Sequence, residues 1–170
     1  MRYFIICLIL LSCKPSNKKN TPKTELNNFE IHIDAIVPKD DFFEVFYLEE
    51  NSNVQVNFSE EKKIKKKVNA SKKVQRITFI LPEKARLHQF RLDFGSNQFQ
   101  KEIITKSITL SYMNNSILIN SDLIKIFFRL NKFIHFNGVD GKMNLKIIAN
   151  KKDPFVIAKP ILIKKIELEL

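Results

Sequence analysis

Apolar and polar residues alternate along most of the chain after residue 28, with the period of two that marks β-strands with one buried face. The first such stretch places Phe29, Ile31 and Ile33 on one side, with a polar residue after each. The other stretches predicted as strands are 42–48, 54–58, 74–81, 87–94, 99–104, 107–112, 133–136, 143–149, 155–157 and 161–170. Short strands separated by turns at intervals of about ten residues indicate a sandwich or a barrel. We expect an all-β, two-sheet antiparallel β-sandwich of the jelly-roll type, formed by residues 29–170 as a single domain.

Three segments add detail to this pattern. Residues 121–130 begin with two residues suited to cap a helix and continue with apolar residues at helical spacing, so we expect at most one short helix, in this region. The run Asn137–Gly141 predicts a hairpin turn. At the C-terminus Ile166, Leu168 and Leu170 alternate with glutamates, which predicts a final strand paired inside a sheet.

The first residues have the pattern of a secretory signal. Arg2 supplies a positive charge, and Phe4–Leu11 is an apolar run too short for a membrane-spanning helix, which needs about 20 residues. The run ends in Leu10-Leu11-Ser12-Cys13, which resembles the lipobox of bacterial lipoproteins. This resemblance implies cleavage between Ser12 and Cys13 and attachment of palmitate-type acyl chains at Cys13. The alternative is an ordinary signal peptide in which Cys13 is incidental.

This interpretation divides the chain into a signal peptide over residues 1–12, a lipidated polar tether over 13–28 and the domain over 29–170. The tether has four lysines and no acidic residue before Glu25. In Bacteroidota, export of lipoproteins to the cell surface is associated with acidic residues just after the cysteine, so we expect the periplasmic face of the outer membrane. Cys7 leaves with the signal, so the domain can form no disulfide, cysteine-based zinc site or cysteine nucleophile.

The chain is basic, with 29 Lys and Arg against 18 Asp and Glu and a net charge of +11. The segment Ser59–Lys73 carries seven of the lysines: Lys62, Lys63, Lys65, Lys66, Lys67, Lys72 and Lys73. Such a patch commonly binds nucleic acid, but a lipid anchor places the domain outside the cytoplasm, so we expect no nucleic-acid partner. Anionic lipid or an acidic glycan is the partner that these lysines could then contact. The alternative is a solvated loop between two strands.

Candidate catalytic and metal-binding residues are few. His32 and Asp34 stand two apart on a predicted strand and could share a metal, but a solvated strand face explains them as well. The sequence has neither a Gly-x-Ser-x-Gly elbow nor a His-Glu-x-x-His motif, so we expect no enzyme, no metal centre and no cofactor. Five aspartates at turns or strand ends could either hold a structural calcium or only stabilise the turns: Asp40, Asp41, Asp93, Asp140 and Asp153.

The stretch Phe90-Arg91-Leu92-Asp93-Phe94-Gly95, followed after a gap by Ile104-Thr105-Lys106-Ser107-Ile108-Thr109-Leu110, resembles galactose-binding-like jelly-roll domains of bacterial envelope proteins. Phe127–Ile134 and Lys152–Phe155 are similar to segments of uncharacterised Bacteroidota envelope proteins. The resemblance implies the sandwich fold and carries no catalytic residue with it. It also raises glycan binding, for which Tyr47 and Tyr112 are the candidate platforms, because sugars stack preferentially on rings with a polar group.

We therefore expect a membrane-anchored lipoprotein of the cell envelope whose domain is a non-catalytic binding or structural-accessory module. A glycan-binding module for envelope polysaccharide handling is the first alternative. A hydrolase with a site that the sequence does not reveal is the second.

Overall fold

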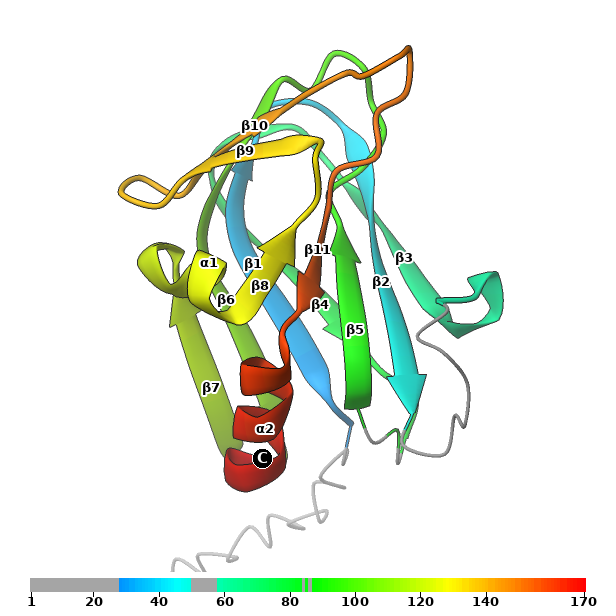
Figure 1. Ribbon diagram of the computed structural model, residues 1–170, viewed down its shortest axis with the longest axis vertical. Coiled ribbons are helices and arrows are strands. Elements are labelled where there is room, and N and C mark those ends of the chain that lie inside the picture. Colours follow the sequence, from blue (N-terminus) through cyan, green and yellow to red (C-terminus); the bar gives the residue numbers. More distant parts are fainter. Residues whose placement is uncertain (1–27, 50–57, 84, 86) are drawn as a thin grey trace, which may run out of the picture.

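A computed structural model describes residues 28–49, 58–83, 85 and 87–170, which form two antiparallel sheets packed face to face (Figure 1). The first sheet has the order β4-β1-β6-β10-β9, with β7 also paired to β6, and the second has the order β3-β2-β5-β11-β8. The strands of the first sheet are β1 (Glu30–Val37), β4 (Ser71–Ile80), β6 (Glu102–Tyr112), β7 (Asn115–Asn120), β9 (Ile134–Asn137) and β10 (Lys142–Leu145). Those of the second are β2 (Asp41–Glu49), β3 (Lys63–Val68), β5 (Leu87–Asp93), β8 (Phe128–Leu130) and β11 (Phe155–Ala158).

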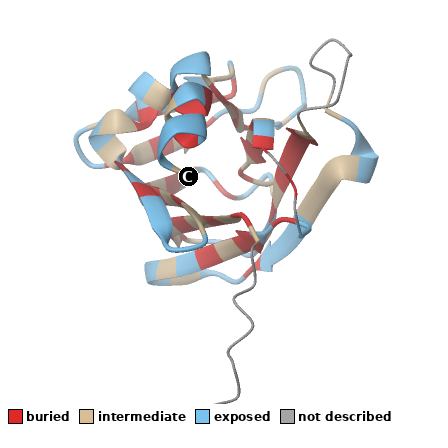
Figure 2. Cartoon of the chain, turned by 90° about the horizontal axis from the view of Figure 1, so that it is seen from below, coloured by how far each residue is buried: buried red, intermediate tan, exposed pale blue. Residues whose placement is uncertain are grey.

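The core lies between the two sheets and follows the alternation of the sequence. In β1 the side chains of Ile31, Ile33 and Ala35 are buried, whereas the residues between them are only half-buried. In β5 the same alternation buries Phe90 and Leu92. Figure 2, which views the domain from one end, shows the buried positions along the inner faces of the strands. The prediction of a two-sheet antiparallel β-sandwich is confirmed.

The local predictions near the middle of the chain are largely confirmed. A 3-10 turn η2 (Ser121–Leu123) runs into a short helix α1 (Ile124–Phe127), as the helical spacing predicted. The turn at Asn137–Gly141 joins β9 to β10 as a hairpin. The segments 99–104 and 107–112 were predicted as two strands, but Glu102–Tyr112 is one strand, because β10 and β7 pair side by side along the same edge of it.

The prediction of a final strand over 161–170 is wrong, because this segment is the helix α2 (Pro160–Glu169). Proline at the first helical position favours a helix start, since it has no N–H to leave unpaired. The buried residues Leu162, Ile163 and Ile166 follow the helical period, whereas Leu168 is 73% exposed. The alternation with glutamates at the C-terminus therefore reflects one turn of an amphipathic helix and not a strand.

The alternative interpretation of the lysine-rich segment as a solvated loop is also wrong. Glu60–Lys62 is the 3-10 turn η1, and the lysines that follow lie on β3 and at the start of β4. β3 is the edge strand of the second sheet and β4 that of the first, so the lysines line one side of the sandwich. Lysines on edge strands hinder pairing with another chain, which gives these residues a structural role that a loop would not have.

Several expectations fall outside the described residues: the signal peptide, Ser12 and Cys13, the tether up to residue 27, and most of the strand predicted over 54–58. Within the described ranges, none of the helices has the length and apolar character needed to span a membrane.

Candidate functional site

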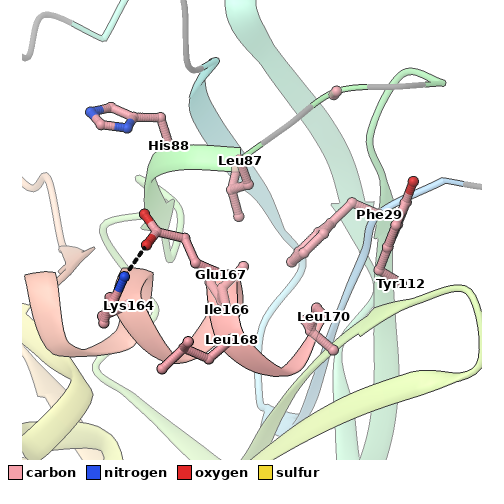
Figure 3. A pocket seen from close by; sticks show the side chains of 10 residues that line it. Phe29, Leu87, His88, Tyr112, Lys164, Ile166, Glu167, Leu168 and Leu170 are labelled. Carbon is pink, nitrogen blue, oxygen red and sulfur yellow. Dashed lines mark hydrogen bonds and ion pairs between the residues drawn. The ribbon is translucent and has the colours of Figure 1, made fainter.

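A pocket of about 790 Å³ opens at the end of the sandwich where the described chain begins (Figure 3). Most of the described side chains that line it are apolar, and they come from both sheets and from α2: Phe29, Ala85, Leu87, Tyr112, Ile166, Leu168 and Leu170. Its polar lining residues are His88, Lys164 and Glu167. A volume of several hundred Å³ with apolar walls and few polar groups is typical of small-molecule binding sites.

Two aromatic residues form the wall on the side of the first sheet. Phe29 immediately precedes β1, and its carbonyl accepts a hydrogen bond of 2.8 Å from the amide of Leu81, which fixes the start of the domain. Tyr112 is the last residue of β6. Their rings stack with centroids 6.4 Å apart and an interplanar angle of 24°. The stacked pair presents a ring surface to the pocket on the side opposite α2 (Figure 3).

Helix α2 forms the opposite wall. Its inner residues Leu162, Ile163 and Ile166 belong to the core, and the last turn brings Leu168 and Leu170 to the pocket. On the rim, Lys164 donates a 3.0 Å hydrogen bond to Glu167. The end of the sandwich is thus closed on one side by a helix that is apolar toward the pocket and charged at the rim.

The described lining residues of the pocket carry few groups that could act as nucleophiles or bases. None of its described lining residues is a serine, threonine, cysteine or aspartate, so these residues offer no hydroxyl or thiol nucleophile except the phenol of Tyr112. His88 is exposed and makes no hydrogen bond with the described residues, while Glu167 is occupied by Lys164. Acid–base chemistry needs a base within hydrogen-bond reach of its partner, and that arrangement does not occur among these side chains.

The two predicted glycan platforms have different positions. Tyr47 points into the core with 7% of its surface exposed, and burial raises the pKa of its phenol. Its ring is not accessible to a ligand in solution. Tyr112 lines the pocket, so of the two tyrosines only this one stands at a cavity. The sequence pointed to Tyr112 by its ring and hydroxyl, but missed Phe29, Leu87 and the residues of α2.

The seven lysines form a partly neutralised edge. Lys62 pairs with Glu49 at 2.5 Å, and Lys63 and Lys65 pair with Glu44 at 3.4 and 3.3 Å. Lys63 also pairs with Glu60, and Lys66 donates to the carbonyl of Thr78 at 2.8 Å. Among the described residues, Lys67, Lys72 and Lys73 form no ion pair. Four of the seven lysines predicted to contact an anionic surface therefore already bind groups of neighbouring segments of the protein.

His32 and Asp34 each have partners on adjacent strands. The ring nitrogens of His32 lie 3.0 Å from the hydroxyl of Thr78 and 3.2 Å from that of Ser111. Asp34 accepts two hydrogen bonds from Arg76, at 2.9 and 2.7 Å, which lower the pKa of its carboxyl. These contacts belong to the outer face of the first sheet, as expected for a solvated strand face. No cluster of three or more His, Cys, Asp or Glu side chains occurs in the described part of the chain.

Asp41, one of the aspartates considered as a calcium ligand, binds the backbone of the loop after β5. Asp41 is buried and accepts hydrogen bonds from the backbone amides of Phe42, Ser96 and Asn97. The ammonium group of Lys152 donates to the carbonyls of Asn97 and Gln100, and burial lowers its pKa. The loop after β5 is therefore fixed from two sides: the carboxylate of Asp41 binds its backbone amides, and the ammonium group of Lys152 binds its backbone carbonyls.

Arg91 and Asp93 form a half-buried pair on the outer face of the second sheet. Arg91 donates two hydrogen bonds of 2.7 Å to Asp93 and lies over the rings of Phe46 and Phe155, 4.2 and 4.6 Å from their centroids. Burial raises the pKa of Asp93 to about 6, although the neighbouring guanidinium opposes this shift. The stretch that carries the resemblance to galactose-binding-like domains thus forms a stacked ion pair on the surface of a strand.

No protein-family model matches this sequence, and searches of curated proteins and of solved structures found no significant match. The resemblances to lipoproteins and to galactose-binding-like domains stay predictions.

Proposed function

We propose that this chain is a lipid-anchored, non-catalytic binding module of the cell envelope, and that its ligand occupies the pocket between β6, β5 and α2. The observation that carries the proposal is this pocket itself, in which aliphatic and aromatic side chains from both sheets and the C-terminal helix lie beside the polar groups of His88, Lys164 and Glu167. The sequence supports the anchor through Ser12 and Cys13, and the polar segment that follows supports a periplasmic tether.

The ligand class that fits this lining is a long acyl chain. Aliphatic and aromatic walls favour an apolar chain, because each buried methylene contributes about 0.8 kcal/mol. The rim pair Lys164 and Glu167 supplies a cation and a carboxylate that can exchange partners with a polar head group. A fatty acid or the acyl chain of a phospholipid has this combination of an apolar body and a charged end.

A calorimetric titration with palmitate tests the proposal. Both sheets and their core are built from residues after 27, so a chain that begins at Lys14 keeps the whole described fold. We expect this chain to bind one palmitate, and the variant Ala85→Trp to lose binding because the indole occupies the pocket that Ala85 lines. The matched control Val139→Trp adds the same ring at a residue that is 93% exposed in the β9–β10 hairpin and should bind as wild type.

The same titration distinguishes an acyl chain from a glycan as the ligand. The glycan alternative is favoured by the position of Tyr112 in the pocket. An oligosaccharide would need the hydroxyl of Tyr112 as well as its ring, so Tyr112→Phe should abolish glycan binding and leave palmitate binding intact. Equal palmitate binding by wild type and Ala85→Trp would contradict the proposed site.

A further inference from the structure

We infer that the end of the sandwich opposite the pocket docks on an anionic phospholipid bilayer, with the ring of Phe99 entering the boundary between head groups and acyl chains. This surface, which we call the basic end, is formed by the connections 38–40, 69–70, 94–101 and 146–154 and by the strand residues beside them (Figure 1). Strand pairing brings these connections together, because Val37 lies opposite Ser71 and Asp93 opposite Phe155. The inference adds a second site to the proposed function and depends neither on the pocket nor on acylation.

Charged residues are distributed unequally between the two ends of the domain. Of the nine glutamates in the described ranges, seven lie on α2 or beside strand ends at the pocket end: Glu30, Glu49, Glu60, Glu61, Glu83, Glu167 and Glu169. The basic end carries seven exposed lysines: Lys39, Lys67, Lys72, Lys73, Lys101, Lys146 and Lys151. None of these lysines forms an ion pair with a described residue. This distribution orients the domain with its basic end toward an anionic surface.

The carboxylates at the basic end leave its excess of positive charge in place. Asp93 and Glu102 are paired with an arginine and a lysine on the same or the adjacent strand. Asp41 is buried, and its carboxylate is bound by backbone amides. Among the described residues of this end, only Asp40 and Asp153 are exposed carboxylates. The seven exposed lysines therefore outnumber them.

Hydrogen bonds hold Phe99 in solvent, where it is 78% exposed in the turn Asn97–Gln100. The ammonium group of Lys152 donates to the carbonyls of both end residues of this turn, Asn97 and Gln100. The amide of Phe99 donates to the side-chain oxygen of Asn97 at 2.9 Å, and Gln100 is buried. Since the turn is fixed on both sides of Phe99, its ring cannot fold into the core. A ring kept in water costs free energy that is recovered when the ring enters an apolar phase.

Two further apolar side chains are exposed at the basic end. Ile147 is 52% exposed and stands two residues after Leu145, whose amide donates a 2.8 Å hydrogen bond to the carbonyl of Lys101 in the loop of Phe99. Phe42 is 48% exposed at the start of β2, beside the aspartate that binds the same loop. Segments that bind anionic bilayers combine such residues, which enter the lipid by about 5–10 Å, with lysines that stay in the head-group layer.

An acidic glycan and the pocket end are the competing partner and the competing surface. A glycan would be attracted by the same lysines, but sugars stack preferentially on rings with a polar group, which Phe99 lacks. The pocket end also exposes apolar side chains, Leu168 and Met113 among them. However, its lysines Lys62 and Lys164 are paired with glutamates. Exposure alone does not distinguish the two ends, and the unpaired lysines favour the basic end.

The length of the tether is compatible with this orientation. Fifteen residues separate Cys13 from Asn28 and can span about 50 Å when extended. The strand β6, with 11 residues, has a length of about 37 Å. A domain anchored at Cys13 could therefore still place its basic end on the same bilayer.

Vesicle binding by the chain that begins at Lys14, which has no anchor, tests the inference. The chain contains no tryptophan, so a single introduced indole reports its own position. Phe99→Trp places the indole at the basic end, Val139→Trp on the β9–β10 hairpin and Ile80→Trp at the pocket end but outside the pocket lining. The vesicles contain brominated phosphatidylcholine, with and without phosphatidylglycerol. We expect Phe99→Trp to lose most of its fluorescence and to shift to shorter wavelength only with phosphatidylglycerol, while the other two keep the emission of a hydrated indole.

Lysine variants in the Phe99→Trp background test the contribution of charge. Replacing Lys101, Lys146 and Lys151 by glutamine should weaken binding to phosphatidylglycerol vesicles by roughly a hundredfold, at about fivefold for each lysine. The matched control replaces three lysines outside the basic end, Lys62, Lys125 and Lys165. It lowers the net charge equally and should bind like the parent.

Three results would overturn the inference. Equal losses in the two triple variants would replace it with attraction by net charge, and stronger quenching of Ile80→Trp than of Phe99→Trp would replace it with docking by the pocket end. An unquenched Phe99→Trp would exclude insertion of this ring, and binding of polygalacturonate by that variant would then identify an acidic glycan as the partner. None of these results alters the palmitate titration, because the substituted residues lie outside the pocket lining, so failure of the docking surface and failure of the proposed ligand are distinguishable.

Discussion

The rings of Phe29 and Tyr112 stack at 6.4 Å between centroids and join the start of the domain to the end of β6. Both residues line the pocket, so the contact that closes the first sheet at this end also forms one wall of the candidate site. Stability of this end of the domain and ligand binding are therefore linked through the same pair of rings.

Replacing Tyr112 separates the contributions of its ring and its hydroxyl. Tyr112→Ala removes one wall of the pocket and the apolar contact that this ring offers to the ligand, so palmitate affinity should fall by about tenfold, which corresponds to about 1.4 kcal/mol. Tyr112→Phe keeps the ring and should bind palmitate as wild type. Isothermal titration of both variants checks this. Loss of palmitate binding in Tyr112→Phe would contradict an apolar ligand and favour one recognised by hydrogen bonds.

Only glycine fits at position 95, because the side chain of Asp41 lies directly against its Cα. It has a φ of +82°, and a Cβ at this position would lie 2.2 Å from the Cγ of Asp41. The variant Gly95→Ala combines a strained backbone with overpacking, each costing about 1–3 kcal/mol, and displaces the carboxylate that holds the loop. We expect a loss of about 2–5 kcal/mol in the free energy of unfolding, measured in urea.

Gly138 provides the matched control for this prediction. The nearest atom to a Cβ built on Gly138 is 3.8 Å away, on the ring of Phe136, an ordinary van der Waals distance. Gly138→Ala should therefore change stability by less than about 0.5 kcal/mol. Equal effects of the two substitutions would show that the loop does not depend on the close approach of Gly95 to Asp41.

The pH dependence of stability should carry a contribution from Asp93. Because the pKa of this carboxyl is raised from 3.8 to about 6, the folded state holds its proton more tightly than the unfolded state. Stability from this group is fully present below pH 4 and is lost as the pH rises to about 6, by roughly 2–3 kcal/mol. Urea unfolding of wild type and Asp93→Asn between pH 4 and 7 measures the difference, and wild type should weaken relative to the variant.

Asp34 gives a control of opposite sign. Its pKa is lowered, first by the hydrogen bond from Arg76, so its contribution is present above the unfolded value of 3.8 and is lost as the pH falls through the folded value. Asp34→Asn should thus lose stability relative to wild type as the pH is raised from acid. If both variants shift the pH profile in the same direction, the assignment for Asp93 is wrong.

The lysines of the two edge strands should limit self-association. Replacing Lys66, Lys72 and Lys73 by threonine removes charge and keeps residues that favour strands, so the edges become free to pair with another chain. Sedimentation velocity should show larger assemblies for this variant than for wild type. The matched variant with arginine at all three positions keeps the charge and should sediment as wild type. An unchanged threonine variant would argue against protection of the edges.

Alternation predicted the sandwich well wherever one face of a strand lies in the core. Ile31 and Ile33 in β1, and Phe90 and Leu92 in β5, are buried at the positions that the period of two assigns. The C-terminal helix was missed because its last turn also alternates. Only Leu168, which is exposed, reveals that this alternation is not that of a strand.

The pocket could not be derived from local pattern. Tyr112 was selected from the sequence for its ring, but its neighbours Phe29, Leu87 and Ile166 are brought to it by strand pairing and by the packing of α2. Tyr47 is buried because its side chain points to the core side of β2. The sequence did not predict this, because the residues on both sides of Tyr47 are also apolar and show no alternation. The strand β3 was not predicted, because most of residues 63–67 are lysines and show no apolar alternation. Its pairing with β2 depends on backbone hydrogen bonds and not on an apolar face.

The most direct test of the acyl-binding pocket is photo-crosslinking in membranes from cells that produce the full chain. A fatty acid with a diazirine near its terminal methyl group is incorporated into the membrane, irradiated, and located by mass spectrometry of peptides. We predict label on α2, on Leu87 or on Tyr112, and loss of this label in Ala85→Trp but not in Val139→Trp. Label on β3 and β4 instead, or equal labelling of wild type and Ala85→Trp, would contradict it.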